Sequence, residues 1–288
     1  MRRLALIVSL ALGLGATGVS GQGKAPVDVS ETVAKIGDYV QQYFARAQSI
    51  IYDETVRVQY LGYDLMSLPE PPRTLVNELR VSWDAATNGG MASPVILRTP
   101  IKVNGRPPGE KDRDKCFDPE ASTPELLGSL FLPENRESFR YSGRPPGKLN
   151  GRPVVVLDAF EREQGQVWVE STEDCYKFGK PGNMKWRVWA DAETLAVMRI
   201  DGSLTGFYDV TLPANRKERT PQRDITVERA DVSIVYKPVR FTDPDESMLL
   251  PASRETVQVI RSANAPRVRI SSQYRNFRRF MTGGRIIQ

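Results

Sequence analysis

Apolar residues recur at every second position along much of this chain, most regularly on either side of one polar turn. Trp186, Val188 and Ala190 follow this period before the polar segment 191–194, and residues 196–200 resume it afterwards. A two-residue period on both sides of a short polar segment is typical of a β-hairpin. Similar segments lie before and after it, so we predict one large antiparallel sheet with this hairpin near its middle.

Segments of the same kind predict the other strands, at 54–63, 75–83, 95–103, 139–141, 154–157, 167–170, 225–241, 249–260 and 267–274. Within the first of them, Val56, Val58 and Tyr60 are expected to share one face. The string Gly-Arg-Pro-Pro-Gly occurs at 105–109 and again at 143–147. Because glycine and proline favour turns, we interpret both copies as connections between strands.

A helical period marks the region before the first strand. Apolar residues recur there at steps of three and four, which predicts a helix of about 20 residues with Ser30 as its N-cap. The apolar face of this helix consists of Val33, Ile36, Val40, Phe44, Ala47 and Ile51. A second, short helix is predicted from Thr123 to Phe131, because Pro124 is tolerated at a first helical position, and Pro133 is expected to end it. Both helices should pack on the sheet.

The first 21 residues predict a secretory signal peptide. Arg2 and Arg3 precede an apolar run from Leu4 to Leu14, and small residues follow up to Gly21. The apolar run is shorter than the roughly 20 residues that a membrane-spanning helix needs. No cysteine follows the predicted cleavage site, so lipidation is not expected. We therefore predict that residues 22–288 form a single soluble β-rich domain, periplasmic or secreted.

The chain contains two cysteines, Cys116 and Cys175. An exported protein meets an oxidising compartment, so a disulfide between them is predicted. On the loop-entropy model, such a bridge stabilises the fold by about 4 kcal/mol. Neither cysteine has a CxxC partner, so a redox function is not expected.

Histidine is absent from the sequence. Its absence excludes Ser-His-Asp and Cys-His catalysis and every histidine-containing zinc site, and two cysteines cannot form a four-cysteine site. We therefore expect a protein without catalytic residues, metal or cofactor. A hydrolase that uses only carboxylates is kept as the third hypothesis, with the candidate groups Asp112/Asp114, Asp191/Glu193 and Asp243/Asp245/Glu246.

The helix-plus-sheet layout and the turn Asp191-Ala192-Glu193-Thr194 resemble the outer-membrane lipoprotein carrier superfamily, whose relatives include periplasmic sigma-factor regulators. Members commonly carry Val-Trp-Asp-Pro-Glu-Thr-Gly in a hairpin, and here Ala192 replaces the proline and Leu195 the glycine. Other stretches, including 39–59, resemble uncharacterised exported proteins of environmental bacteria. The resemblance implies an α+β fold, in which a large curved antiparallel half-barrel is packed against a long N-terminal helix and one short helix.

The first functional hypothesis is an exported binding protein that carries or senses an apolar ligand, a lipid or a lipoprotein, in the cell envelope. A curved sheet under a helix can leave an apolar cavity for such a ligand. The residues expected to line it are Trp83, Val156, Trp186, Val188 and Met198. A closed core would use the same residues, so only a lipid-sized pocket would favour this hypothesis.

The second hypothesis is a structural or regulatory envelope protein with an arginine-rich C-terminal face. From Arg261 onward the chain has arginines and no acidic residue, and the candidates for an anionic surface are Arg267, Arg269, Arg275, Arg278 and Arg279. Export argues against nucleic acid and towards an anionic surface or an envelope protein. The alternative is that Arg267 and Arg269 form the solvated face of a strand that buries Val268 and Ile270.

Overall fold

The computed structural model describes residues 28–47, 49–83, 94–112, 117–119, 127–163, 168–172, 175–180, 182–212, 223–261 and 267–279. The predicted signal peptide and Cys116 lie outside these residues, and so does the side chain of Cys175. Export, the disulfide and the single-domain organisation therefore remain predictions.

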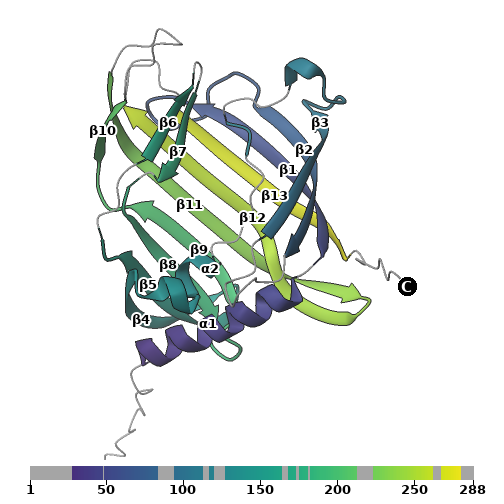
Figure 1. Ribbon diagram of the computed structural model, residues 1–288, viewed down its shortest axis with the longest axis vertical. Helices are drawn as coiled ribbons and strands as arrows, with labels where there is room; N and C mark the ends of the chain where they lie inside the picture. The colour runs from purple at the N-terminus through teal and green to yellow at the C-terminus, as the bar shows by residue number, and fades with distance from the viewer. Residues whose placement is uncertain are drawn as a thin grey trace, which may run out of the picture.

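Three α-helices, one short 3-10 helix and thirteen strands make up the described fold (Figure 1). The N-terminal half contains α1 (Val29–Arg46), β1 (Ile50–Leu61), β2 (Arg73–Trp83), β3 (Pro94–Val103), η2 (Glu110–Asp112), α2 (Leu127–Phe131), α3 (Pro133–Arg136), β4 (Phe139–Leu149) and β5 (Arg152–Glu161). The C-terminal half contains β6 (Trp168–Thr172), β7 (Cys175–Lys180), β8 (Met184–Asp191), β9 (Val197–Leu204), β10 (Tyr208–Leu212), β11 (Arg223–Thr242), β12 (Asp245–Arg261) and β13 (Arg267–Arg279).

Eleven strands form one antiparallel sheet, in the order β3-β2-β1-β13-β12-β11-β9-β8-β5-β4, with β10 paired to β11. The pair β6-β7 forms a separate hairpin. The large sheet curves, and α1 and α2 lie across one end of its concave side (Figure 1). This architecture confirms the predicted α+β fold with a half-barrel-like sheet. We call the face that α1 and α2 cover the inner face and the opposite one the outer face.

The hairpin predicted around residues 191–194 is present as β8 and β9. Its turn is held by Asp191, whose carboxylate accepts hydrogen bonds from the backbone N–H groups of Glu193 at 3.1 Å and Thr194 at 3.0 Å. Leu195, which follows this turn, has a left-handed φ of 56°. The predicted location near the middle of the sheet is wrong, because the long strands β11 and β12 occupy the middle and the hairpin lies nearer the β4 edge.

The boundaries of α1 differ from the prediction, whereas α2 ends at Phe131 as predicted, and its predicted start at Thr123 lies outside the described residues. The N-cap of α1 is Asp28, whose carboxylate accepts the N–H of Glu31 at 3.1 Å, and Ser30 lies in the first turn. The helix ends at Arg46, so Ile51 belongs to β1 instead of the helix. Pro133 begins α3, as expected of a proline at a first helical position, instead of only ending the preceding helix.

Only one copy of Gly-Arg-Pro-Pro-Gly follows a turn as predicted. Asn104 and Gly105 make that turn with φ angles of 48° and 81°. The second copy, 143–147, lies within β4, where the register with β5 shifts between Arg144 and Gly147. Because β4 is an edge strand, it has a partner strand on one side only. A proline whose nitrogen faces the other side removes no hydrogen bond between strands.

The alternation in β1 also changes near its end. Val56 and Val58 are buried as predicted, but Tyr60 is 43% exposed and Gln59 is buried. The side-chain amide of Gln59 donates to the backbone carbonyls of Tyr60 and Leu68, at 3.2 and 3.3 Å. These bonds hold the loop that follows β1 over the outer face, so Gln59 is covered where an exposed residue was expected.

The core lies between the helices and the inner face. Val33, Ile36 and Val40 of α1 belong to one buried cluster with residues of nine strands and of α2. Gly37 faces α2 so closely that an added Cβ would lie 2.8 Å from the carbonyl oxygen of Phe131. Trp186 packs across Gly202, where an added Cβ would lie 2.3 Å from the indole ring.

Among the described residues, no helix is both long and apolar enough to span a bilayer.

Candidate functional site

Of the five residues predicted to line an apolar cavity, the four with described side chains lie in two packed clusters. Trp186 and Val188 pack in the inner-face cluster, whereas Val156 and Met198 pack in a smaller cluster with Val154. Since Leu157 pairs with Val188, the preceding residue of β5 must point to the outer face. Trp83 ends β2, and its side chain is outside the described residues. The four described side chains thus contribute to two separate packed clusters.

The predicted arginine-rich face is partly formed. In the register of β13 with β1, Arg267, Arg269 and Arg275 pair with residues of the outer face, and Arg278 reaches Asp53 and Glu78 at 3.5 and 3.2 Å. Arg279 lies on the inner face instead, where it is hydrogen-bonded to Glu246 and stacks 4.8 Å from the ring centre of Phe241. A register shift between β1 and β13 at Ile51/Asp53 accompanies this change of side.

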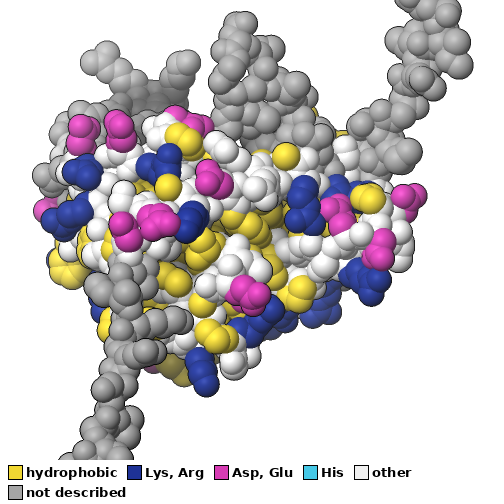
Figure 2. Space-filling model, turned by 90° about the horizontal axis from the view of Figure 1, so that it is seen from below, with side chains coloured by type: hydrophobic (Ala, Val, Ile, Leu, Met, Phe, Trp, Pro, Cys, Tyr) yellow, Lys and Arg dark blue, Asp and Glu magenta, His cyan; other side chains and the backbone are white. Residues whose placement is uncertain are grey.

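The space-filling view from below shows how the charges are distributed (Figure 2). Basic side chains gather along the lower margin of that view, and most acidic ones lie above it. The surface at this end of the molecule is therefore mixed in charge, and its basic residues form a band along one side.

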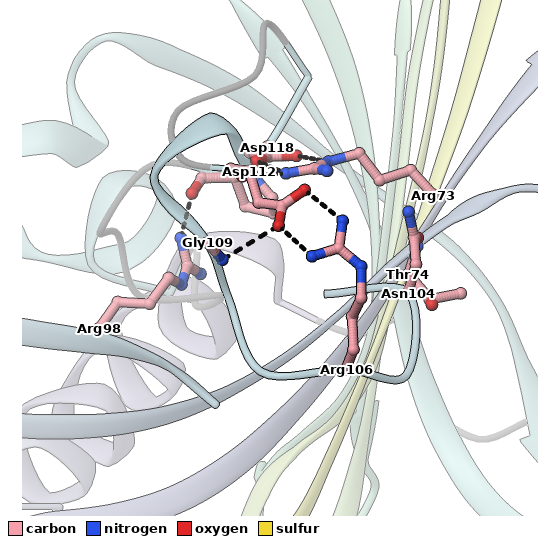
Figure 3. Close-up of polar contacts among 9 residues, drawn as sticks. Arg73, Thr74, Arg98, Asn104, Arg106, Gly109, Asp112 and Asp118 are labelled. Carbon is pink, nitrogen blue, oxygen red and sulfur yellow. Dashed lines mark hydrogen bonds and ion pairs between the residues drawn. The ribbon is translucent and has the colours of Figure 1, made fainter. Parts of the chain in front are cut away.

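The carboxylates proposed for a hydrolase are held by structural interactions. Asp112 accepts two hydrogen bonds from Arg106, at 2.7 and 3.0 Å, and one from the backbone N–H of Gly109 at 3.0 Å (Figure 3). The Gly109 bond, followed by the Arg106 bonds, lowers the pKa of Asp112 below its ordinary value. Asp114 lies outside the described residues. An acid that is ionised so readily does not suit a general acid at neutral pH.

The other two groups have the same character. Burial disfavours ionisation of Glu246, but hydrogen bonds from Arg46 and Arg279 outweigh it and lower its pKa. Asp245 pairs with Arg240 at 3.1 Å, and Asp191 holds its turn. These carboxylates each have an arginine or a turn as their partner, and the described geometry gives the hydrolase hypothesis no support.

A second polar cluster attaches the segment 104–119 to the sheet (Figure 3). Arg73 donates two hydrogen bonds to Asp118, at 2.7 and 2.6 Å, and a third to the backbone carbonyl of Asp112 at 2.6 Å. Arg98 bridges the carboxylate of the buried Glu54, at 3.0 Å, and the carbonyl of Pro119. These hydrogen bonds tie the segment to β2 and β3, which indicates an anchor for the loop.

A hollow on the outer face crosses five strands, β8, β9, β11, β12 and β13, and has a volume of about 500 Å³. Its basic lining residues are Lys185, Arg187, Arg199, Arg229 and Arg269. Its acidic lining residues are Asp201, Asp231 and Glu255. We call this hollow the outer-face pocket. Its lining has five basic and three acidic residues, so its net charge is positive.

The pocket exists because small residues lie between long ones in the strand register. Arg269 of β13 pairs with Val257, which pairs with Asp231 of β11. At the other end, Lys185 of β8 pairs with Ser203 of β9. Side chains on directly paired residues stand beside one another, so valine and serine form a low floor between two long cations.

Most of the charges in and beside the pocket are neutralised locally. The ion pairs are Arg187–Asp158 at 2.8 Å, Arg199–Asp201 at 2.8 Å and Arg229–Asp231. Asp158 is 2% exposed and also accepts from Arg144 at 2.6 Å. Burial opposes its ionisation, but the hydrogen bonds from Arg187 and Arg144 outweigh burial and lower its pKa.

Two cations of the outer-face pocket differ from the rest. The Nε of Arg269 is buried from solvent and has no hydrogen-bond partner among the described residues. Lys185 has only a distant carboxylate, since its Nζ lies 4.0 Å from Asp158, and its ammonium lies 5.4 Å from the ring centre of Phe160. A guanidinium that lines a pocket and has no acidic partner among the described residues is the kind of group that pairs with an anionic ligand.

Sequence reasoning identified Arg269 but missed the four other basic residues of the pocket. Arg187 and Arg199 alternate with the apolar residues of the β8-β9 hairpin, and that alternation was the available signal. It places both side chains on the polar face of their own hairpin. It does not show that β11, β12 and β13 continue the same face.

Comparisons with known proteins give few relatives. No protein-family model matches the chain, and no curated protein does. One similar solved structure is a putative outer membrane lipoprotein-sorting protein domain from Vibrio parahaemolyticus, with 11% identity and a TM-score of 0.37 over 87% of this chain and 94% of that one. Another is a LolA superfamily protein from Nitrosomonas europaea, with 6% identity and a TM-score of 0.38 over 88% of this chain and 95% of that one.

A third similar structure is the MucA/MucB complex of Pseudomonas aeruginosa, with 10% identity and a TM-score of 0.26 over 86% of this chain and 100% of the matched one. A likeness of this extent assigns no ligand or partner, so the function is argued from the residues of this chain alone.

Proposed function

We propose that the protein is a non-enzymatic binding protein that captures an anionic group of its partner in the outer-face pocket. The observation that carries this proposal is Arg269, whose Nε is sealed from solvent and unpaired while its side chain lines the pocket. An anionic oxygen in the pocket would pair with the Arg269 guanidinium, which lines it, by a charge-assisted hydrogen bond. The basic excess of the pocket would favour the approach of such a group.

The distribution of apolar residues supports this proposal over an apolar carrier. The residues expected to line a cavity are divided between two packed clusters on opposite faces of β5, β8 and β9. The carboxylate geometry likewise favours binding over hydrolysis, since the candidate acids are held by arginines and by turn N–H groups. Packed apolar clusters together with a net positive pocket are the combination expected of an interaction protein.

The proposal is tested by nuclear magnetic resonance of the mature chain labelled with ¹⁵N-arginine. N-acetylglutamate amide, a probe with one negative charge, is titrated at low ionic strength while the Nε–H signals are followed. The Arg269 signal, assigned by its loss in Arg269→Gln, is expected to shift saturably, and the shift should weaken as salt screens the charge.

Arg275→Gln provides the matched control. Arg275 lies on the same strand and the same face, but outside the pocket, and its guanidinium donates to the side chain of Gln273 at 2.7 Å. Its Nε–H signal should respond weakly and without saturation. Equal responses of Arg269 and Arg275, or none from Arg269, would overturn the proposal.

A further inference from the structure

The outer-face pocket is elongated across the strands. Its two poorly neutralised cations, Arg269 and Lys185, lie on β13 and β8, with β12, β11 and β9 between them. Four strand spacings of about 4.8 Å place their backbones roughly 19 Å apart. Both side chains line the same hollow, so one ligand of sufficient length can reach both.

Between these two cations the pocket has a small negative excess. Three acids, Asp201, Asp231 and Glu255, and two arginines, Arg199 and Arg229, line this part. Asp231 has Arg229 as its ion-pair partner, whereas Glu255 accepts only a long hydrogen bond, 3.4 Å, from the hydroxyl of Ser271. The carboxylate of Glu255 therefore favours a hydrogen-bond donor from the ligand and repels a negative charge.

We propose that the ligand is an extended acidic peptide segment, in which two acidic side chains flank a neutral stretch. One acid would pair with Arg269 and the other with Lys185, while backbone N–H groups between them would face Glu255 and Ser233. This inference rests on the proposed function and makes it specific. A uniformly charged polyanion, such as polyphosphate or a sulfated glycan, is disfavoured because it would bring negative charge against Asp231 and Glu255.

The span also limits the spacing of the two acids. An extended peptide rises about 3.3 Å per residue, so roughly 19 Å corresponds to about six residues. Side chains reach inward from both ends, which shortens the required separation to about four or five residues. Adjacent acids would reach only one of the two cations.

The test uses calorimetric titration of the mature chain with peptides of the form acetyl-Glu-spacer-Glu-amide. The spacers consist of alternating glycine and serine, with no, two, four or six residues. The four-residue spacer is expected to bind about tenfold more tightly than the peptide with adjacent glutamates, because only the longer one makes both charge-assisted contacts. A six-glutamate peptide of similar length should bind more weakly than the four-residue spacer peptide.

Variants of the two cations show whether one ligand spans both. Arg269→Gln and Lys185→Gln should each weaken binding of the four-residue spacer peptide roughly fivefold to tenfold, the loss of one charged contact. Lys185→Gln should leave binding of N-acetylglutamate amide to Arg269 unchanged. Arg275→Gln is the control on the same face, and circular dichroism of each variant confirms that it is folded.

The outcomes separate this inference from the proposed function. If the number of spacer residues has no effect on affinity, or if the six-glutamate peptide binds most tightly, the proposal of a peptide with two separated acidic side chains is wrong. A saturable response of the Arg269 Nε–H signal to N-acetylglutamate amide would then still support capture of an anion. If neither that probe nor any peptide binds, both the inference and the proposed function fail.

Discussion

The inner and outer faces of the same strands have contrasting chemistry. Ile234 is fully buried on the inner face, while its neighbour Ser233 lines the outer-face pocket and donates a hydrogen bond to Asp201 at 2.8 Å. Helices α1 and α2 cover the inner face, so its residues must be apolar and closely packed. In the pocket region the outer face carries alternating arginines and acids, and the hollow forms where small residues interrupt them.

This contrast shows that stability and binding are divided between the two faces. A truncation on the inner face leaves a cavity in a packed core, whereas a change in the outer-face pocket alters charge with little loss of packing. The predictions below test this division, from the largest expected effect to the smallest.

Ile234→Ala should lower the free energy of unfolding by about 2–5 kcal/mol, because it removes a buried side chain that packs opposite Ile200. Denaturant unfolding of the purified variant measures the change. Ser233→Ala, one residue away on the other face, should cost less than about 1 kcal/mol, the loss of one hydrogen bond. Similar losses for the two variants would contradict the proposed division.

Asp158→Asn tests the most deeply buried acid of the outer face. The substitution removes the charge that Arg144 and Arg187 share, and we expect a loss of about 1–3 kcal/mol, the usual range for a buried charged hydrogen-bond acceptor. Both arginines are 35–44% exposed, so water solvates them in the variant and limits the cost. Denaturant unfolding measures it, and an unchanged stability would show that the cluster is not structural.

The acid dependence of stability follows from three lowered pKa values, those of Asp158, Asp191 and Glu246. Each contribution is complete above the ordinary pKa of the unfolded chain, 3.8 for aspartate and 4.5 for glutamate. Each is lost as the pH falls through the lower value of the folded state. The melting temperature should therefore fall as the pH is lowered below about 4.5.

Asp158→Asn provides the control for this acid dependence. Because it removes one of the three groups, its melting temperature should decrease less steeply over the same pH range. A pH profile parallel to that of the unchanged protein would show that Asp158 does not contribute.

Gly37→Ala tests how closely the helix covers the inner face. Alanine normally stabilises a helix relative to glycine by roughly 1 kcal/mol. Here its Cβ would meet the Phe131 carbonyl oxygen at 2.8 Å, so we expect destabilisation by about 1 kcal/mol instead. Denaturant unfolding gives the sign. Gln41→Ala, on the exposed side of α1, should change stability by less than about 0.5 kcal/mol.

Arg80→Gln should have the smallest effect. Its ion pair with Glu78, at 2.9 Å, lies on the outer face of β2 with the arginine side chain 54% exposed. Exposed ion pairs of this kind contribute little, so the free energy of unfolding should change by less than about 0.5 kcal/mol. A larger loss on chemical unfolding would mean that outer-face charges hold the sheet together.

Much of the fold could be predicted from local patterns. The two-residue period gave the strands of the β8-β9 hairpin, and the three- and four-residue steps gave α1, because both periods reflect one element alone. Errors arose where tertiary context acted. Pro145 and Pro146 look like turn residues, but the edge position of β4 accommodates them in a strand.

The candidate site was predictable only in part. Arg269 was identified because it alternates with apolar residues in a C-terminal segment rich in arginine. The same reasoning grouped it with Arg279, which the register shift between β1 and β13 places on the opposite face. The apolar candidates failed for a similar reason, since Val156 and Val188 lie on different strands whose relative register is not a local property.

By itself, the sequence determined the periodicity of each element, the N-terminal helix, and the exclusion of histidine-dependent chemistry. Those properties depend on residues close together in the chain. Only the tertiary structure decided which of the basic residues surround a hollow and which have an acidic partner. The outer-face pocket joins Lys185 to Arg269 across five strands, and that order and register are set by packing of the whole sheet.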